Sequence, residues 1–409
     1  MPSPVLSPAL RALTDAVRTG TPRAEEEFWR HVETTGTPLV EPDPDGDPAH
    51  RLVTFLWRDD PDRPAGDVLA LLHTVTDKDR HAGDLVPHLM TRLPGTGVWA
   101  IGHRLRADHR ASYQFYVSHG PREEALRADR ASWRRVLDLA LPDPLNSDPP
   151  LPARDGRHPA SVMALDEAPP QPWTARRADP ARGTHRDEEL DGRRITVHLP
   201  AGHRADGGPY PVVVLLDGEM WGPVLGVGDT LDNLLADGRI PPTVTLLVDS
   251  MGRRHEDLSC SDAFVDWLAD RLLPWAARRH AADEDPERTV IAGQSAGGLT
   301  AAFAAYRRPE RFGNVLAQSG SFWWPDDEAS ESGGEWLTGR YAACERLPVR
   351  FHLEVGLQEW MLLAQNRRLR DVLRERGYDL TYEEFNGGHD YACWRGGLAS
   401  GLAGLLGRP

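Results

Sequence analysis

The sequence is almost without lysine: of its 47 basic residues, Lys78 is the only one that is not an arginine. Basic residues are also outnumbered, because 62 acidic side chains leave a formal net charge of −15. Nucleic acids and anionic lipid surfaces attract proteins through clustered Lys and Arg. The charge balance therefore argues against partnership with nucleic acid or a membrane, and allows an anionic small ligand only where arginines gather locally.

Cysteine and long apolar runs are equally scarce. The three cysteines, Cys260, Cys344 and Cys393, are too few and too scattered for a disulfide framework or a zinc site. No stretch approaches the roughly 20 apolar residues that span a bilayer. The amino-terminal residues also lack the basic start, apolar run and cleavage site of a secretory signal. We therefore expect a cytoplasmic protein.

Glycine and proline are abundant, with 38 and 35 residues, and a chain of 409 residues is long enough for two domains. Proline crowds the stretch from Leu141 to Trp173, which suits an extended connector with little core of its own. We predict an amino-terminal domain over residues 1–150, a Pro-rich linker over 151–173 and a second domain over 174–409.

The amino-terminal domain has two kinds of pattern. Leu10, Leu13 and Val17 recur at helical spacing, and a second helix is predicted after Thr21-Pro22. Alternating or β-rich runs then follow at 51–57, 98–104 and 112–117, separated by turn residues. Together these runs predict a small immunoglobulin-like β-sandwich behind two leading helices.

The second domain alternates apolar strands with helices. Strands are predicted at 194–199, 212–216, 244–248, 290–292, 315–318, 351–355 and 380–385, and a helix at about 262–275. Buried strands separated by helices form a mostly parallel sheet with helices on both faces. The second domain is therefore predicted to be α/β.

A candidate nucleophile lies in the segment from Thr289 to Thr300. Gly293, Ser295 and Gly297 form a G-x-S-x-G pattern after a β-branched strand and before a helix of small residues. The pattern alone is weak in a glycine-rich chain, and an ordinary strand-to-helix turn is the alternative. Its placement is that of a nucleophile elbow, where we expect a Cβ at either glycine to collide with its surroundings. Ser295 is the predicted nucleophile of an α/β hydrolase.

A serine hydroxyl needs a base within hydrogen-bond reach, and in α/β hydrolases the histidine comes late in the chain. His389 follows Asn386-Gly387-Gly388, a loop just after the last predicted strand. Its ring is placed to reach back over the carboxyl edge of the sheet. We predict His389 as the general base.

The acid that orients the base should lie between the nucleophile and the histidine in chain order. Glu359 is our choice, because it follows the strand at 351–355 and the turn after it. Glu354 lies within that strand, Asp371 within the next helix, and Asp390 next to the histidine. A Ser-His dyad without an acid also remains workable.

The tetrahedral intermediate of ester hydrolysis needs two amide donors for its oxyanion. One is the N–H of Ala296, at the start of the helix that follows Ser295. The second is expected from the loop Asp217-Gly218-Glu219-Met220-Trp221, through a backbone amide from Glu219 to Trp221, with Glu219 and Met220 as the chosen candidates. An ordinary strand-end turn is the alternative for this loop.

Several segments resemble the enterochelin (ferric enterobactin) esterases. They are LLDGEMW at 215–221, RRHEDLSC at 253–260, GQSAGG at 293–298, LAQSGSFWW at 316–324, LEVGLQEW at 353–360 and GGHDYACWRGGL at 387–398. The last is the most specific, because a histidine loop followed by Cys393-Trp394-Arg395 is not a general hydrolase feature. The likeness covers nearly the whole chain and is patchy in the first domain.

This resemblance implies a cytoplasmic serine esterase that cleaves the trilactone of a ferric catecholate siderophore and needs no metal or organic cofactor. It matches the family's serine to Ser295, its histidine to His389 and an arginine to Arg254, with Asp257 in place of a glutamate. It also implies an amino-terminal domain that helps to close the substrate site, while the second domain suffices for the reaction itself.

A ferric tris-catecholate is a trianion with flat rings, so the site should offer positive charge and stacking surfaces. Arg254 is the candidate for charge, and the candidates for stacking are Trp221, Trp323, Trp324 and Trp394, although such tryptophans more often belong to a core. The alternatives are a carboxylesterase or acyltransferase for another ester, and a ferric-siderophore-binding protein without catalysis.

Overall fold

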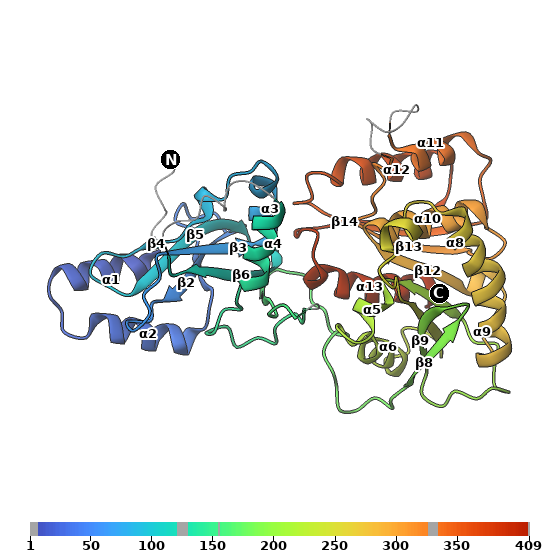
Figure 1. The fold of residues 1–409 in the computed structure, drawn as a ribbon, viewed down its shortest axis with the longest axis horizontal. Coiled ribbons are helices and arrows are strands. Elements are labelled where there is room, and N and C mark those ends of the chain that lie inside the picture. The colour runs from blue at the N-terminus through green and yellow to red at the C-terminus, as the bar shows by residue number, and fades with distance from the viewer. Residues whose placement is uncertain (1–6, 121–129, 154–155, 326–333, 408–409) are drawn as a thin grey trace. The chain divides into compact units, whose positions relative to one another are not determined.

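The computed structural model describes residues 7–120, 130–153, 156–325 and 334–407 (Figure 1). The chain divides into two units. The first comprises Met1–Pro169 together with Asn386–Ala392, and the second comprises Pro170–Phe385 together with Cys393–Pro409. The main division falls inside the predicted linker. The short segment Asn386–Ala392, which carries His389, was not expected to belong with the first unit.

The first unit begins with two helices, α1 (Pro8–Arg18) and α2 (Ala24–Thr35). Ser7 caps α1, because its hydroxyl accepts a hydrogen bond from the Leu10 N–H at 3.1 Å. Both helices bury apolar side chains against one face of a sheet, in a cluster that includes Leu10, Leu13, Phe28, Trp29, Val32, Leu39, Leu56 and Val98. The two predicted helices are confirmed.

Two antiparallel sheets make the predicted β-sandwich. One has the order β1-β2-β5-β4 and the other the order β3-β6-β7. Their strands are β1 (Leu39–Pro42), β2 (His50–Arg58), β3 (Asp67–Leu72), β4 (Thr91–Arg92), β5 (Val98–Arg106), β6 (Arg110–Ser118) and β7 (Ser161–Ala164). Phe55 and Tyr113 meet edge to face across the sandwich, with ring centroids 4.9 Å apart.

Part of the predicted linker is wrong, because Ser161–Ala164 forms β7 and pairs with the edge of β6. A short edge strand between proline-rich flanks leaves little local signal. The remaining elements of the unit are α3 (His73–His81), a 3-10 turn η1 (Val86–His88) and α4 (Arg130–Leu139).

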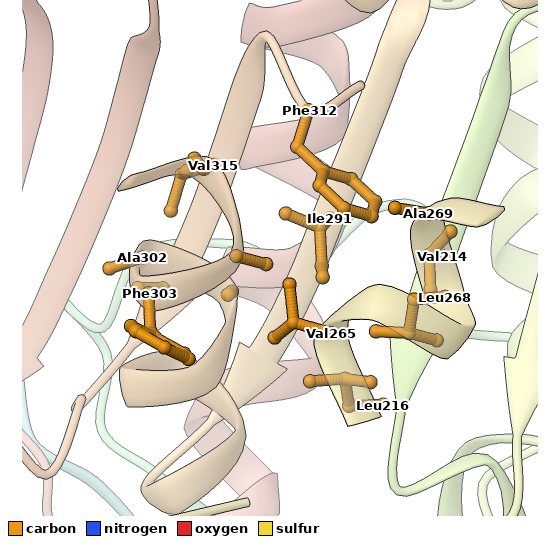
Figure 2. Packing of buried hydrophobic residues seen from close by; sticks show 14 of the residues in the cluster. Val214, Leu216, Val265, Leu268, Ala269, Ile291, Ala302, Phe303, Phe312 and Val315 are labelled. Atoms are coloured by element: carbon orange, nitrogen blue, oxygen red, sulfur yellow. The ribbon is translucent and has the colours of Figure 1, made fainter. Parts of the chain in front are cut away.

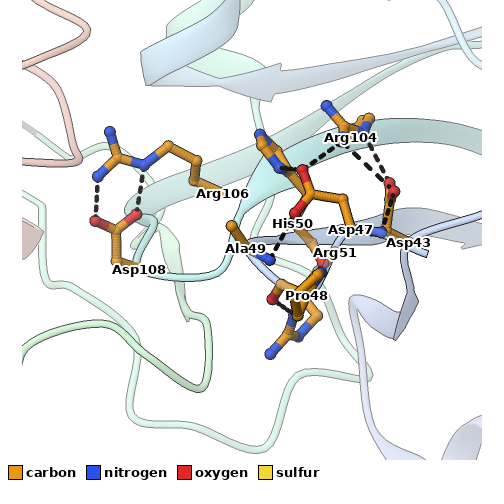
Figure 3. Close-up of polar contacts among 9 residues, drawn as sticks. All are labelled: Asp43, Asp47, Pro48, Ala49, His50, Arg51, Arg104, Arg106 and Asp108. Atoms are coloured by element: carbon orange, nitrogen blue, oxygen red, sulfur yellow. Dashed lines mark hydrogen bonds and ion pairs between the residues drawn. The ribbon is translucent and has the colours of Figure 1, made fainter. Parts of the chain in front are cut away.

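Ion pairs lie along β5 and the turn after it (Figure 3). Arg104 donates to Asp43 at 2.7 Å and to Asp47 at 3.0 Å. Arg106 makes a two-pronged pair with Asp108, which lies in the turn between β5 and β6. Bidentate pairs of this kind fix a carboxylate's position as well as its charge.

The second unit is built on one eight-stranded sheet with the order β15-β14-β13-β12-β10-β11-β9-β8. The first six strands in this order, from β15 to β11, pair in parallel. Strand β9 is antiparallel to β11, and β8 is antiparallel to β9. The strands are β8 (Thr184–Leu190), β9 (Arg193–Leu199), β10 (Val212–Leu216), β11 (Val244–Val248), β12 (Thr289–Gln294), β13 (Asn314–Gln318), β14 (Arg350–Gly356) and β15 (Asp379–Phe385). The predicted mostly parallel sheet is confirmed, and β8 is additional.

Helices cover the sheet on both faces. They are α5 (Gly218–Trp221), α6 (Val227–Ala236), α7 (Arg254–Asp257), α8 (Asp262–Trp267), α9 (Leu273–His280), α10 (Ala296–Arg307), α11 (Trp336–Ala343), α12 (Leu363–Glu375) and α13 (Tyr391–Leu406). A π-helical turn, η3 (Leu268–Leu272), joins α8 to α9, and a 3-10 turn, η4 (Pro286–Arg288), precedes β12. Figure 2 shows Leu268 of η3 and Phe303 of α10 packing over the sheet, where Val214 of β10 and Ile291 of β12 lie.

The opposite face of the sheet is covered in part by α13. A Cβ on Gly401 of this helix would lie 2.5 Å from Leu316 of β13. Among the described residues, every helix is too short or too polar to cross a lipid bilayer. None of the three cysteines forms a disulfide.

Candidate active site

Ser295 stands alone in a sharp turn between β12 and α10. Its φ of 58° and ψ of −121° belong to a region that non-glycine residues rarely adopt. The turn is held on both sides, because the Ser295 N–H donates to the Gln318 carbonyl at 3.0 Å and the Ser321 N–H donates to the Ser295 carbonyl at 3.0 Å. The Ser295 hydroxyl lies 3.3 Å from that of Ser321. This is the strained geometry of a nucleophile elbow.

The two glycines of the motif have different physical roles. A Cβ on Gly293 would lie 2.5 Å from the backbone carbonyl of Gly297, so only glycine fits at position 293. A Cβ on Gly297 would instead meet Asp217 at 3.5 Å, an ordinary van der Waals contact. The expected collision is therefore confirmed at Gly293 and wrong at Gly297.

The oxyanion donors are only partly as expected. Ala296 is the first residue of α10, so its N–H is one of the first-turn amides that have no partner within the helix. On the loop after β10, the Met220 N–H already donates to the Asp217 carbonyl at 2.9 Å. Met220 is therefore withdrawn as a donor, because α5 is a helical turn that uses this amide. Glu219 remains the candidate from that loop.

The loop is fixed by close packing and by its side chains. Asp217 has a left-handed φ of 56°, and a Cβ on Gly218 would lie 2.5 Å from the backbone of Leu247 on β11. The Glu219 carboxylate accepts hydrogen bonds from the backbone N–H and the hydroxyl of Ser250. The Glu219 backbone is thus held from β10 and from the loop after β11.

Arg254 is paired within the second unit. Its Nε and one terminal nitrogen donate to the two oxygens of Asp217 at 2.7 and 2.9 Å. The Asp217 side chain is 2% exposed and that of Arg254 is 37% exposed. Asp257, the departure from the family pattern, plays no part in holding Arg254: it pairs with Arg193 at 2.7 and 2.9 Å.

Glu359 lies in the turn after β14, where the sequence predicts an acid. Only 5% of the residue is exposed. One carboxylate oxygen accepts the Gly356 N–H at 2.8 Å and the hydroxyl of Ser319, which in turn accepts the Trp394 indole N–H at 3.0 Å. These two donors fix the position and direction of the carboxylate.

A buried row of polar side chains runs across the sheet directly beside the elbow. The Trp221 indole donates to Gln294, Gln294 donates to Gln318, and Gln318 donates to Glu354, at 2.8, 2.8 and 2.6 Å. Gln294, Gln318 and Glu354 are register partners on β12, β13 and β14. Burial raises the pKa of Glu354 to about 8, although the Gln318 bond opposes the rise. The row was not predicted, because no short motif marks it.

His389 lies between β15 and α13, within the segment Asn386–Ala392 that belongs with the first unit. Within the first unit, the Arg110 N–H donates to the Asn386 carbonyl at 3.0 Å, and the Asn386 amide donates to Asp108 at 2.7 Å. Asp108 is the carboxylate that Arg106 grips in Figure 3. The histidine segment is therefore anchored on the β5–β6 turn of the sandwich.

Two further contacts complete this anchorage. Asp390 accepts the Ser112 N–H at 2.6 Å and the Ala392 N–H at 2.9 Å, so its carboxylate serves the backbone of the segment and of β6. A Cβ on Gly388 would lie 3.0 Å from Thr74 of α3. The candidate base therefore lies in a segment that belongs with the first unit.

The four tryptophans differ in burial. Trp221 and Trp394 are 1% and 4% exposed, and their indole N–H groups donate to Gln294 and Ser319. Their rings offer no open face, so we withdraw both as stacking residues. Trp324 is partly buried and meets Trp336 edge to face, and Trp323 is 36% exposed. Trp323 alone presents substantial open surface.

A cavity of about 590 Å³ adjoins the loop that carries Glu219. Arginines and acidic residues line it: Arg176 and Arg182 from the segment before β8, Arg194 of β9, and Asp229 and Asp232 of α6. Ser295 is not part of its lining, so we do not assign it to the ester.

Two family models match the chain. The model described as "Putative esterase" matches residues 190–405, and the model described as "Enterochelin esterase, N-terminal" matches residues 52–174. The first covers more than half of the chain and contains Ser295, Glu359 and His389.

Relatives match over nearly the full length. The iron(III) enterobactin esterase of Dickeya dadantii is 34% identical, over 93% of each chain. The ferric enterobactin esterase of Salmonella typhimurium is similar in structure, with a TM-score of 0.79, 32% identity and coverage of 93% and 98%. The Shigella flexneri enterobactin esterase, solved in the presence of enterobactin, has a TM-score of 0.75 and 31% identity, and the match covers 93% of this chain and 97% of that one. The chain therefore belongs to the enterochelin (iron(III) enterobactin) esterase family.

Proposed function

We propose that this protein hydrolyses the trilactone ester bonds of a ferric catecholate siderophore, with Ser295 as nucleophile and His389 as general base. One observation carries the proposal: the strained Ser295 elbow lies in a chain that is similar, over almost its whole length, to iron(III) enterobactin esterases. Iron(III) enterobactin is named in those relatives, and we extend a substrate of this kind to the present chain on that similarity.

In the proposed reaction, His389 removes the proton from the Ser295 hydroxyl as its oxygen attacks a lactone carbonyl. The oxyanion is stabilised by the N–H groups of Ala296 and Glu219. Collapse expels the seryl or threonyl alkoxide, which takes the proton from His389, and leaves an acyl-enzyme. Water, activated by His389, then releases the acid and restores Ser295. Glu359 is proposed to orient His389, and its fixed, buried carboxylate supports that role.

Recognition of a trianionic ligand is proposed to use Arg254 and the tryptophans Trp323 and Trp324. More than a third of the Arg254 side chain is exposed while it holds Asp217, so its guanidinium can serve an anionic partner as well. The open surface of Trp323 suits a catechol ring. We further propose a cytoplasmic location, in keeping with three cysteines that form no disulfide.

The test is direct. The purified protein is incubated with ferric and iron-free enterobactin-type trilactone, beside a Ser295→Ala control, and linear trimer, dimer and monomer are followed by mass. Ring opening that depends on Ser295 supports the proposal. Turnover of a simple aryl ester without ring opening would favour a general carboxylesterase. Tight ligand binding with no product from either ester would favour a carrier without catalysis.

A further inference from the structure

Three potential metal ligands meet on strands β14 and β15 of the second unit: His352, Glu354 and Glu383. One donor atom from each lies within 4.8 Å of the other two. His352 and Glu354 are two residues apart on β14 and so point to the same face of the sheet. Glu354 is the register partner of Glu383 on β15. The strand geometry therefore brings the three side chains together.

The imidazole of His352 is left incomplete by the protein. The residue is 3% exposed, and its Nε2 is buried without a hydrogen-bond partner. A buried polar nitrogen with no partner costs about 1–3 kcal/mol. Native proteins rarely leave such a group unsatisfied unless a ligand or an ordered solvent molecule completes it.

The two glutamates pose a second problem. Glu354 and Glu383 stand directly opposite each other on neighbouring strands, so ionising both would place two like charges side by side, with little solvent near Glu354, which is 3% exposed. Gln318 supplies one donor to a Glu354 oxygen. Within the part of the chain that the structure describes, Glu354 forms no ion pair, and this donor is a neutral amide. A cation bound between the two glutamates would allow both to ionise.

Helix α13 is shaped to leave room for these polar groups. A Cβ on Gly397 would lie 2.0 Å from a Glu354 carboxylate oxygen, and one on Gly401 would lie 3.1 Å from the His352 ring. Each glycine within a helix costs about 1 kcal/mol relative to alanine. The two glycines therefore lower the stability of α13 at the place where the helix covers the His352 imidazole and the Glu354 carboxylate.

We propose that His352, Glu354 and Glu383 form a binding site for a divalent transition-metal ion, with Zn²⁺ as the best match. One imidazole and two carboxylates are ligands that Zn²⁺ accepts, and a water molecule would complete a tetrahedron. Tetrahedral Zn²⁺ holds its ligand atoms roughly 3.3 Å apart. The three ligand atoms here lie within 4.8 Å of one another, and the exposed Glu383 side chain can move to shorten these distances.

The site takes no part in ester hydrolysis, and a bound ion would link β14 to β15. It ties β14 to β15, the two strands that lead to Glu359 and to the segment of His389. Through Glu354 and Gln318 it also touches the row that ends beside Ser295. The bound ion stabilises this edge of the sheet and takes no part in bond cleavage.

The test uses the full-length protein stripped of metal with a chelator and then titrated with ZnCl₂ by calorimetry. We expect one Zn²⁺ per chain and a higher thermal midpoint on binding. Glu383→Gln and His352→Val should each weaken Zn²⁺ binding at least tenfold. Glu383 is at the surface, so its variant remains informative even if His352→Val folds poorly. Mg²⁺, which prefers octahedral oxygen ligands, should not compete.

Glu384→Gln is the matched control, because Glu384 is the next residue on β15 and pairs with Arg367 at 2.7 and 2.8 Å. This variant should bind Zn²⁺ as the wild type does. Replacement by Co²⁺ should give visible absorption bands that Glu383→Gln weakens. The absence of stoichiometric binding, or equal affinity in Glu383→Gln and wild type, would overturn the proposal. Either result is independent of whether the trilactone is cleaved.

Discussion

The carboxylate of Asp390 accepts a hydrogen bond from the backbone N–H of Ser112 at 2.6 Å, although 278 residues separate the two in sequence. This bond connects the residue after His389 to a strand of the sandwich. The amino-terminal unit thereby becomes part of the support of the candidate base.

Asp390→Asn should lower kcat about tenfold on any ester, with a small change in KM. The amide keeps one acceptor oxygen where the carboxylate uses two, and a charge-assisted bond contributes about 1.5–3 kcal/mol. Steady-state kinetics on the trilactone and on an aryl ester measure this effect. Asp166→Asn, which alters a surface pair with Arg51 in the same unit, is the control. Unchanged kcat in Asp390→Asn would show that the anchorage does not position His389.

Arg254→Gln should destabilise the second unit by about 3 kcal/mol, because it leaves the buried Asp217 carboxylate without its partner. It should also slow neutral esters, since Asp217 begins the loop that carries the Glu219 amide. Urea unfolding and aryl-ester kinetics report the two effects. The double variant Asp217→Asn/Arg254→Gln should regain much of the stability. Loss of activity on the anionic trilactone alone would instead assign Arg254 purely to ligand binding.

Gly293→Ala should destabilise the protein by at least about 2 kcal/mol and remove most esterase activity, because its Cβ would meet the Gly297 backbone at 2.5 Å. Gly339→Ala in α11 is the matched control, with no neighbour within 4 Å of the added methyl. It should be neutral or slightly stabilising. Thermal midpoints of the two variants make the comparison, and equal midpoints would contradict the crowded turn.

The first unit should lose stability as pH falls from about 6.5 to about 4, partly through His109. Burial lowers the pKa of His109 to about 4 in the folded chain, and the residue is 2% exposed. Unfolding therefore takes up a proton in this range, so stability present above pH 6.5 is lost on acidification. The contribution is about 3 kcal/mol at most.

His109→Gln should reduce the loss of stability on acidification, and it should change the stability at pH 7 by a smaller amount. Urea midpoints at pH 7 and pH 4.5 give the comparison. His31→Gln, an exposed histidine on α2, is the control and should leave the acid loss as it is. An identical acid loss in wild type and His109→Gln would exclude His109 as the cause.

Local patterns predicted those parts of the molecule that depend on neighbouring residues. The strand before Ser295 and the helix after it follow from a β-branched run and a run of small residues, and the structure places both as expected. The sandwich strands and leading helices follow from periodicity in the same way. The place of Glu359 just after β14 follows from the predicted strand and turn, and its role as the acid stays a prediction.

The errors concern single atoms and distant partners. Met220 failed as a donor because one helical turn directs its N–H to Asp217, and composition cannot show that direction. Trp221 and Trp394 resembled ligand contacts in the sequence, yet each indole serves the polar interior. The place of His389 depends on partners such as Arg110 and Ser112, which no local pattern links to residues 386–392.

The segment Asn386–Ala392 also determines when the first unit can be finished during synthesis. All other residues of the first unit have been made once the ribosome passes Pro169, but this segment is translated more than two hundred residues later. At ~5–20 residues per second this delay is about 11 to 45 s. The nascent sandwich must therefore wait, with the binding partners of Asn386 and Asp390 unfilled, until almost the whole polypeptide has been translated.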